Sequence, residues 1–374
     1  MNSCEKPIRT AVIMAGGSGE RFWPLSRRLR PKQLLRLAHP EKTLLEQSIE
    51  RVEPIVPKEN IFIATARHLK DAILAAPTGL PEKNILCEPC KRNTAGCLVY
   101  AAASLLTRYS DPSQVTIAVL TADHLIRDSE RFRESVETAW AVAEEHHSLV
   151  VMGIKPTRPE TGYGYIETKE QVSPVMVTSS GIAVLPAAGF REKPDRATAE
   201  TFVKSGRFFW NSGMFFWRLQ TFLDELRVAS PPHAEATWQL AEALRAGDTA
   251  RVEAVFESLP DISIDYALME KARRVHVVRA DFDWDDIGAW DALERTYPTD
   301  AEGNVCIGDP IVIDSKSCII YNELGANDMA VGVVGVDNLA VIVSRDGILV
   351  IPKDRAQDVR KVVAELKNKG YRQL

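Results

Sequence analysis

A glycine-rich turn between an apolar run and a group of cations is the feature that most constrains this chain. The run Ile8–Met14 predicts a buried strand, and it is followed directly by Ala15, Gly16, Gly17, Ser18 and Gly19. Such small residues let backbone N–H groups approach a phosphate closely. Fixed positive charge comes next, on Arg21, Arg27, Arg28, Arg30 and Lys32. We therefore predict a polyphosphate-binding loop that follows the first strand.

Two common phosphate-binding fingerprints do not fit this turn. No Gly-Lys-Ser/Thr closes the loop, as the Walker sequence requires. The dinucleotide fingerprint needs a third glycine where the chain has Phe22, and Trp23-Pro24 would interrupt a helix that began there. A glycine turn alone is more often structural, but the flanking Arg21 and Lys32 favour a polyphosphate ligand.

The bulk composition places the chain among ordinary globular proteins. It has 374 residues, of which 45% are hydrophobic and 26% charged, enough for one large domain and a smaller one. The net charge of −5 argues against a nucleic-acid partner. An anionic substrate must then be met by local cations. No signal-peptide core and no membrane-spanning run is apparent, so we expect a cytoplasmic protein with no membrane partner.

Apolar strands alternate with helical patterns in the first half, which predicts an α/β fold with a Rossmann-like, mixed but mostly parallel sheet. The expected strands are Ile8–Met14, Ile61–Ala64, Asn84–Cys87, Val115–Leu120, Ser148–Ile154 and Val275–Val278. The expected helices begin at Thr43, Ala66, Asn93 or Thr94, and Ser129, and helical sequence returns over 218–259 and 264–272. Pro and Gly punctuate residues 155–217, and we expect these to form an insertion over the ligand-binding edge of the sheet.

The composition changes after Pro298. Six short apolar runs, separated by Asp, Asn and Gly, predict a stack of short strands that forms a partial β-helix. Asp354 is expected to cap a final helix. We therefore predict a catalytic domain over residues 1–300 and a small β-rich domain over 301–374 that ends in a helix. Its apolar strand edges could serve association, which leaves a homodimer open.

Polar residues at three places could carry chemistry. Asp123 follows the predicted central strand, and ligands of open α/β sheets bind beyond the carboxyl ends of strands. A lone Asp there is often a helix cap, but Mg²⁺ takes one or two carboxylates together with phosphates. His124 could act as a base, although a phosphate group that serves as nucleophile is already ionised at neutral pH and needs none. A second carboxylate could come from Asp285 or Asp286, which otherwise belong to a charged turn before a helix.

The segment Glu88–Ala95 follows a strand and opens a helix. An Asn or Thr N-cap explains part of it. A carboxylate can also accept from two N–H donors of a nucleotide base together, as N1–H and N2 of guanine would offer, and Glu88 is the nearest candidate. Arg92 and Asn93 could then reach O6, N7 or the ribose.

These segments resemble the sugar-phosphate nucleotidylyltransferase family, whose signature is G-G-x-G-x-R followed by P-K. The remaining motifs occur in the family's order: E-P-x-x-R-N-T-A from Glu88, A-D-H at 122–124, T-G-Y-G-Y-I from Thr161, F-x-E-K-P from Phe190, W-N-S-G-M-F from Trp210, and W-x-D-[VIL]-G from Trp284. Residues 22–26 and 30–33 are similar to the branch that uses GTP and mannose 1-phosphate. The resemblance implies the nucleotide-diphospho-sugar transferase fold, GDP-mannose and diphosphate as products, and Mg²⁺ as cofactor.

The resemblance also implies roles for individual residues. The nucleotide would be bound by Ala15, Gly16, Gly17, Ser18, Gly19, Glu88, Arg92, Asn93 and Thr94. Arg21 would stabilise the leaving diphosphate, and Lys32 would lie nearer the α-phosphate. Asp123 and Asp286 would hold the metal, with Asp285 as the alternative to Asp286.

The same resemblance assigns the sugar side. Gly164 would bind sugar hydroxyls through its main chain, and Glu192 and Asn211 would bind them through their side chains. Lys193 would bind the sugar phosphate, and it completes the implied catalytic set with Arg21 and Lys32.

Three alternatives remain open. The sugar could be a heptose, fucose or glucose phosphate, or the nucleotide could differ. A non-catalytic regulatory paralogue should have lost Arg21, Lys32 or Asp123, all of which are present. A bifunctional enzyme with an attached isomerase would need a further β-barrel of about a hundred residues, which we do not expect in this chain.

Overall fold

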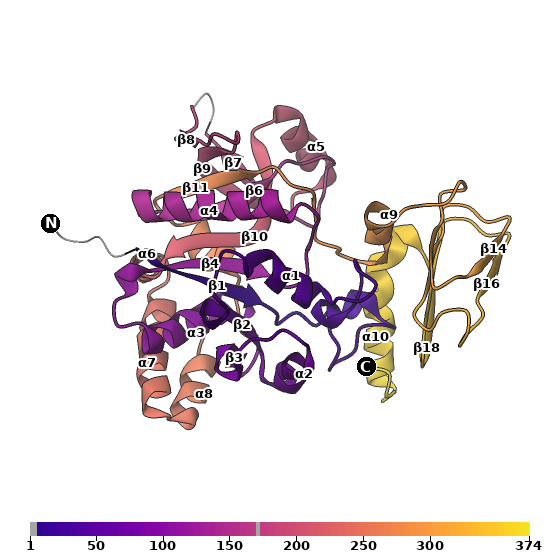
Figure 1. Cartoon of the computed structure of the whole chain (residues 1–374), viewed down its shortest axis with the longest axis horizontal. Helices are drawn as coiled ribbons and strands as arrows, with labels where there is room; N and C mark the ends of the chain where they lie inside the picture. The colour runs from indigo at the N-terminus through magenta and orange to yellow at the C-terminus, as the bar shows by residue number, and fades with distance from the viewer. Residues whose placement is uncertain (1–5, 170–172) are drawn as a thin grey trace. The chain divides into compact units, whose positions relative to one another are not determined.

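The computed structural model describes residues 6–169 and 173–374, and the chain divides into two compact units (Figure 1). The first unit comprises Met1–Ala15, Ser48–Thr121 and Ile126–Asp283. The second comprises Gly16–Gln47, Ala122–Leu125 and Trp284–Leu374. The glycine-rich turn therefore belongs to the second unit, although the strand that precedes it belongs to the first.

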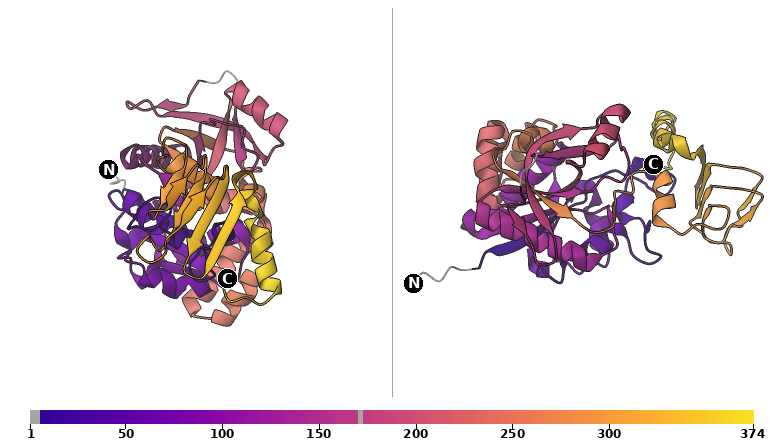
Figure 2. Two further views of the ribbon diagram at one scale, coloured as in Figure 1. Left: turned by 90° about the vertical axis from the view of Figure 1, so that its right-hand side faces the viewer. Right: turned by 90° about the horizontal axis from the view of Figure 1, so that it is seen from above.

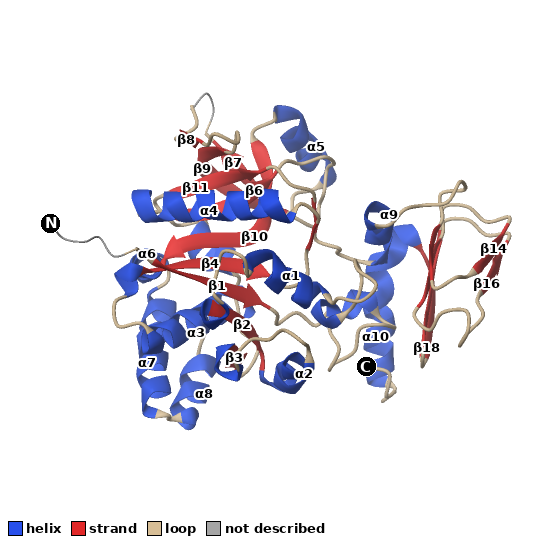
Figure 3. Ribbon diagram, viewed as in Figure 1, coloured by secondary structure: helices blue, strands red, loops and turns tan. Residues whose placement is uncertain are grey.

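A ten-stranded mixed sheet forms the centre of the first unit (Figure 3), in the order β3-β2-β1-β4-β10-β6-β11-β9-β7, with β8 paired to β9. Parallel pairing joins β3, β2, β1 and β4, and separately joins β6 and β11. The remaining pairs are antiparallel. These strands are β1 (Ile8–Met14), β2 (Ile61–Ala66), β3 (Ile85–Glu88), β4 (Val115–Thr121), β6 (Leu149–Ile154), β7 (Gly164–Thr168), β8 (Met176–Val177), β9 (Ala183–Glu192), β10 (Phe208–Arg218) and β11 (Val275–Ala280).

The mixed α/β class predicted from the sequence is confirmed, but the expected insertion over residues 155–217 is wrong. Strand β10 lies inside the sheet between β4 and β6, and β7 and β9 extend the same sheet. The physical reason is visible in the run Met214–Trp217, which is buried throughout. A run that is apolar at every position is typical of a strand covered on both faces.

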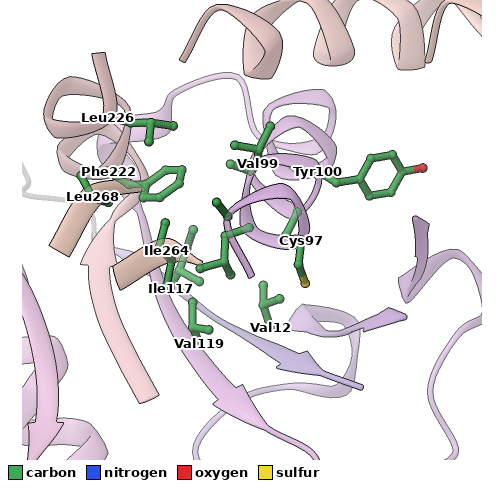
Figure 4. Close-up of a cluster of buried hydrophobic side chains, with 14 of the residues drawn as sticks. Val12, Cys97, Val99, Tyr100, Ile117, Val119, Phe222, Leu226, Ile264 and Leu268 are labelled. Carbon is green, nitrogen blue, oxygen red and sulfur yellow. The ribbon is translucent and has the colours of Figure 1, made fainter. Parts of the chain in front are cut away.

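Helices cover both faces of this sheet. On one face, α3 (Asn93–Arg108), α6 (Leu219–Ala229) and α7 (Pro231–Ala246) share a buried cluster with Val12 of β1 and with Ile117 and Val119 of β4 (Figure 4). Helix α4 (Ser129–His146) contacts β4, β6, β10 and β11, and contributes no residue to that cluster. Successive residues of a strand point to opposite faces, so α4 covers the other face.

The predicted start at Ser129 is confirmed for α4, and the predicted Thr43 cap is confirmed. Helix α2 (Lys70–Ala75) begins at Lys70 rather than Ala66, because a 3₁₀ turn, Arg67–Leu69, precedes it. Helix α3 begins at Asn93, but the predicted Asn or Thr cap is wrong, since Arg92 is the N-cap residue and no side chain caps this helix.

Thr43 and Glu46 form a reciprocal capping box at α1 (Leu44–Val52), with Glu46 N donating to Thr43 Oγ1 and Thr43 N donating to Glu46 Oε2. Asp195 accepts from Thr198 N at α5. Helix α1 crosses the boundary between the two units after Gln47, and the first unit also contains α2, α5 (Arg196–Ser205) and α8 (Thr249–Glu257).

Two further helix predictions need correction. The predicted helix over 264–272 is a single π-helical turn, Asp265–Met269. The last helix, α10 (Val359–Asn368), begins later than expected, because a 3₁₀ segment, Lys353–Asp358, contains Asp354. A 3₁₀ turn is common at a helix N-terminus, and its side-chain pattern resembles the start of the α-helix itself.

The second unit contains the predicted partial β-helix (Figure 2). Strands β13, β15 and β17 pair in parallel, β18 closes this sheet in the antiparallel direction, and β14 and β16 form a second parallel pair. Their bounds are β13 (Val305–Ile307), β14 (Ile311–Ile313), β15 (Ile319–Asn322), β16 (Gly332–Val334), β17 (Leu339–Ser344) and β18 (Gly347–Pro352). The unit also contains β12 (Trp284–Asp285) and α9 (Leu293–Thr296), and β5 (Leu125–Ile126) spans the boundary between the two units.

Early and late parts of the chain share one core in the second unit. Phe22 packs edge-on against Trp290, with ring centroids 5.1 Å apart, and Trp290 Nε1 donates to Trp23 O over 3.1 Å. Trp23 Nε1 in turn donates to Gln373 O over 2.8 Å. The turn that follows the glycines is therefore fixed by residues near the other end of the chain.

Within the part of the chain that the structure describes, no helix has the length and apolarity needed to cross a bilayer.

The Trp290 contacts predict a large effect of truncation. Because Trp290 is fully buried, Trp290→Ala should lower the unfolding free energy of the second unit by about 3–5 kcal/mol. Trp238→Ala is the matched control, since Trp238 of α7 is 47% exposed, and should change it by less than about 0.5 kcal/mol. Urea unfolding followed by circular dichroism measures both. Equal effects of the two variants would show that Trp290 does not organise this core.

Candidate active site

The glycine-rich turn packs directly against Lys32. Gly19 has a φ of 61°, and a Cβ at this position would lie 2.5 Å from Lys32 Cβ. Only glycine allows both this left-handed backbone and this close approach. The cation predicted to bind phosphate is therefore held beside the turn predicted to bind phosphate.

The ammonium of Lys32 is the centre of a charge cluster in the second unit. Lys32 is only 5% exposed. Its Nζ donates to Asp123 Oδ2 over 3.0 Å and to the main-chain oxygen of Asp286 over 2.5 Å. A buried cation needs such acceptors to replace water. The structure thus brings Lys32 together with both of the residues that the sequence suggests as metal ligands.

Asp123 is held ionised by its neighbours. Burial raises the pKa of Asp123, but the charges of Lys32, His124 and Arg21 outweigh this effect and leave the pKa below its ordinary value. His124 lies beside Asp123. The Nδ1 of His124 accepts from Trp284 Nε1 over 3.2 Å. This contact orients the imidazole and gives His124 a structural role beside the carboxylate.

The two adjacent carboxylates at 285 and 286 differ in their surroundings. Arg295 donates to both oxygens of buried Asp285, over 2.7 Å and 3.2 Å. The Asp286 carboxylate instead lies beside Gly288 and the Arg21 guanidinium, since a Cβ on Gly288 would touch Asp286 Oδ2 and Arg21 Nη1. Asp285 is therefore engaged by Arg295, whereas the Asp286 carboxylate lies beside Arg21.

Arg21 completes this cluster. Burial and the nearby Arg360 lower the pKa of Arg21, whereas Asp286 and Asp123 raise it. A guanidinium remains charged throughout the working pH range. Arg21 Nη1 also donates to Gln357 Oε1 over 3.4 Å. The structure therefore places two cations, Arg21 and Lys32, next to two carboxylates.

A second group of predicted residues meets in the first unit. Gly164 of β7 is the register partner of Glu192 of β9. A Cβ on Gly164 would lie 2.7 Å from Glu192 Oε2 and 3.5 Å from Asn211 Cβ. The absence of a side chain at 164 therefore lets Glu192 and Asn211 approach the Gly164 backbone closely, so the three residues predicted to bind the sugar lie together.

A bulge in β10 sets the direction of Asn211. The pairing of β10 with β6 shifts register between Asn211 and Phe215, and Gly213 in the bulge has a φ of 70°. Gly213 N donates to Asn211 Oδ1 over 3.0 Å, and Ser212 Oγ donates to Met152 O over 2.6 Å. The polar Asn-Ser-Gly at the middle of an apolar strand thus builds the bulge itself.

Asp265 is a residue of this group that the sequence reasoning missed. Asn211 Nδ2 donates to Asp265 Oδ1 over 2.8 Å. Burial, together with the charge of Glu192, raises the pKa of Asp265. Asp265 begins the π-helical turn, a conformation that is frequent at functional sites. From sequence alone, its only signal was an acidic residue, one of two with Glu270, in a mostly apolar helical pattern.

Lys193 lies beside Glu192 and has an unusual backbone. Its Nζ is 3.0 Å from Glu192 Oε1, and its side chain is mostly exposed. The φ of Lys193 is 45°, and its N–H donates to Tyr163 O over 3.2 Å. A left-handed backbone at a residue other than glycine is uncommon and is typical of functional sites.

The segment that follows β3 holds the predicted base-binding residues. Glu88 is 8% exposed, and this burial raises its pKa to about 7 in spite of a hydrogen bond with Cys97. Asn93 is left-handed, with a φ of 54°. Thr94 Oγ1 accepts from Ile264 N, and Arg92 donates to Glu257 O. Thr94 and Arg92 therefore also have structural partners.

The donor set of the second unit fits a hard divalent cation. Mg²⁺ is usually bound by one or two carboxylates, with phosphate and water oxygens filling its other positions. Asp123 and Asp286 supply two such groups. No cluster of three or more potential ligand side chains occurs among the residues that the structure describes.

Comparisons with known proteins agree with this geometry. Residues 10–303 match the family described as nucleotidyl transferase, and residues 308–366 match the MannoseP isomerase/GMP-like β-helix domain. The chain belongs to the nucleotidyl transferase family and is an enzyme.

Several proteins of this family are similar to the chain over most of its length. A mannose-1-phosphate guanylyltransferase of Klebsiella pneumoniae is 38% identical over 359 residues, which cover 95% of this chain and 73% of that protein. The xanthan biosynthesis protein XanB of Xanthomonas campestris pv. campestris (strain B100) is 38% identical over 96% of this chain and 73% of its own length. A crystal structure from Thermus thermophilus, of a protein called mannose-1-phosphate geranyltransferase, has a TM-score of 0.83 and 38% identity, and covers 96% of this chain and 99% of that one.

The raised pKa of Glu88 predicts how stability depends on pH. A carboxyl whose pKa rises from 4.5 when unfolded to about 7 when folded stabilises the protein below pH 4.5, and this contribution is lost as the pH rises to 7. Because glutamine does not ionise, Glu88→Gln removes this loss of stability at high pH. At 1.36 kcal/mol per unit, the variant should therefore exceed the wild type by up to about 3 kcal/mol at pH 8, and match it near pH 4.5.

Urea unfolding at several pH values measures this difference. Glu82→Gln is the control, because a hydrogen bond from Lys70 lowers the pKa of the exposed Glu82. Its difference from the wild type should have the opposite sign. A Glu88→Gln difference that does not change with pH would contradict the burial argument.

Proposed function

We propose that this enzyme transfers the guanylyl group of GTP to mannose 1-phosphate, giving GDP-mannose and diphosphate. The observation that carries the proposal is the Lys32 cluster, which joins a glycine turn, two cations and two carboxylates in a nucleotidyl transferase whose relatives include mannose-1-phosphate guanylyltransferases. In the proposed reaction, an oxygen of the sugar phosphate attacks the α-phosphorus of GTP in line, and diphosphate leaves. The attacking oxygen is already ionised, so no general base is needed.

Positioning and charge neutralisation do most of the proposed work. The amides of Gly16, Gly17, Ser18 and Gly19 hold the triphosphate. The predicted contact from the Ala15 amide is not retained, because this amide already donates to Ala64 O over 2.8 Å. Arg21 neutralises the charge that develops on the departing diphosphate, and Lys32 lies nearer the α-phosphate. Lys32 is already fixed by Asp123 and the Asp286 carbonyl, so it needs little reorganisation when the charge develops.

The first unit supplies the proposed nucleoside and sugar contacts. Glu88, in its ionised form, accepts from N1–H and N2 of guanine, and Arg92, Asn93 and Thr94 line the same segment. For the sugar, the Gly164 backbone, Glu192 and Asn211 accept and donate to hydroxyls, with Asp265 orienting Asn211. Lys193 holds the phosphate of mannose 1-phosphate.

Magnesium is the proposed cofactor, with Asp123 and Asp286 as its protein ligands. When bound, Mg²⁺ would offset charge on the phosphate oxygens of the two anionic substrates. The low pKa of Asp123 supports this assignment, because an ionised carboxylate is the form that binds Mg²⁺.

A nucleoside triphosphate as donor also leads us to propose the cytoplasm as the place of action.

The test of the reaction is diphosphate release over a grid of nucleoside triphosphates and hexose 1-phosphates in the presence of Mg²⁺. We expect turnover to require GTP and mannose 1-phosphate. Turnover with another pair would retain the mechanism but overturn the specificity. Absence of turnover with every pair, together with GDP-mannose binding, would favour a regulatory protein.

Variants in the same assay test the assigned roles. Lys32→Ala should lower kcat by about 10²–10³, the usual cost of a preorganised electrostatic contact. Lys204→Ala is the control, because Lys204 is an exposed residue in the last turn of α5. A near-normal kcat for Lys32→Ala would exclude the proposed role.

We further propose a catalytic domain over 1–300, a β-rich domain over 301–374, and association of the latter with a second copy of the chain. An apolar face supports the association, since Ile311, Ile313 and Val334 on paired β14 and β16 are 63%, 50% and 63% exposed. Sedimentation should give a dimer for the wild type and a monomer for Ile311→Lys with Val334→Lys. A monomeric wild type would exclude this partner.

A further inference from the structure

Asp285, the carboxylate that is not assigned to the metal, accepts hydrogen bonds from the backbone and from Arg295. Its Oδ1 accepts from Ile287 N over 2.7 Å, and both of its oxygens accept from Arg295. A carboxylate that accepts from the N–H two residues later closes a turn around the residue between them. That residue is Asp286.

The backbone held by this turn is strained. Ile287 has a φ of 42°, although it is β-branched and fully buried. β-Branched residues rarely adopt a left-handed conformation, so the surroundings must impose it. The short hydrogen bond from Ile287 N to Asp285 is the contact that stabilises this geometry, and a two-point contact with Arg295 fixes Asp285 in turn.

The consequence reaches both functional groups of Asp286. Its carbonyl accepts from Lys32 Nζ over 2.5 Å, and its carboxylate lies beside Gly288 and Arg21. Rotation of the peptide between 286 and 287 would move the carbonyl away from the buried ammonium. It would also change the direction of the carboxylate.

We propose that the Asp285–Arg295 pair is a positioning device for the reaction: it locks the turn at Asp286 and so aligns the Lys32 ammonium and the Asp286 carboxylate. Neither Asp285 nor Arg295 touches a substrate or a metal in this role. The inference rests on the proposed function, because it gives Asp286 and Lys32 their roles in phosphate and metal binding.

A series of three variants should show graded losses. Asp285→Ala removes both contacts, Arg295→Lys keeps the charge but loses the two-point geometry, and Asp285→Asn keeps an acceptor for Ile287 N. Loss of a group that orients a metal ligand typically costs 10–100-fold in activity or metal affinity. We therefore expect kcat to fall by about 100-fold, 10-fold and less than 10-fold, respectively, with the KM for mannose 1-phosphate unchanged.

A matched control is available in the first unit. Arg9 donates to both oxygens of Glu144, over 3.0 Å and 2.9 Å, at the start of β1. Arg9→Lys makes the same chemical change in a pair of similar geometry that no proposed role involves. Its kcat should match that of the wild type.

Binding of Mn²⁺, followed by electron paramagnetic resonance with GDP-mannose present, supplies a measurement that does not depend on turnover. The affinity should fall about 10-fold in Arg295→Lys and remain unchanged in Arg9→Lys. Thermal unfolding of each variant separates this effect from loss of the fold. If Asp285→Ala does not fold, Arg295→Lys and Asp285→Asn carry the test.

Two outcomes would separate failure of the inference from failure of the proposed function. Wild-type kcat and Mn²⁺ affinity in folded Arg295→Lys and Asp285→Ala would overturn the positioning role. The variant Asp286→Asn tests separately whether Asp286 is a metal ligand. If this variant also keeps wild-type Mn²⁺ affinity, then the assignment of Asp286 as a ligand has failed, and with it the basis of the inference.

Discussion

One buried ammonium group joins the three chain segments from which the second unit is built. Lys32 comes from the segment Gly16–Gln47, its partner Asp123 from Ala122–Leu125, and the carbonyl of Asp286 from Trp284–Leu374. A charge that has lost its water must be met by acceptors in fixed positions, because leaving it unpaired costs several kcal/mol. The same requirement that holds the segments together therefore places a cation and two acidic residues beside the glycine turn.

The first unit positions its polar groups by a different means, through exceptions to regular backbone. A bulge in β10 directs Asn211, a π-helical turn presents Asp265 to it, and Lys193 has a left-handed backbone next to Glu192. Each of these conformations costs free energy relative to a regular strand or helix. In the second unit, the left-handed backbone of Ile287 is another such exception to regular backbone. Strain thus occurs next to the residues that the proposed reaction uses.

The sequence predicted well what is encoded locally. Strand β1 and helix α4 have the predicted bounds, because hydrophobic periodicity and capping residues mark them. Family resemblance supplied the candidate residues, and the structure brings Lys32 to Asp123 and Gly164 to Glu192. What the sequence could not give is pairing over long separations. The central place of β10, the contact of Asp265 with Asn211, and the bond between Arg295 and Asp285 arise only when the chain folds.

The contacts of Trp23 have a consequence for how the enzyme matures during synthesis. Trp23 is synthesised 350 residues before Gln373, whose main-chain oxygen accepts from Trp23 Nε1. Glu20 pairs likewise with Lys367. Domains fold as they emerge, from the N-terminus onward. The sheet of the first unit can therefore form while the turn beside Arg21 still lacks its partners, and this turn reaches its final form only after Lys367 and Gln373 have been synthesised.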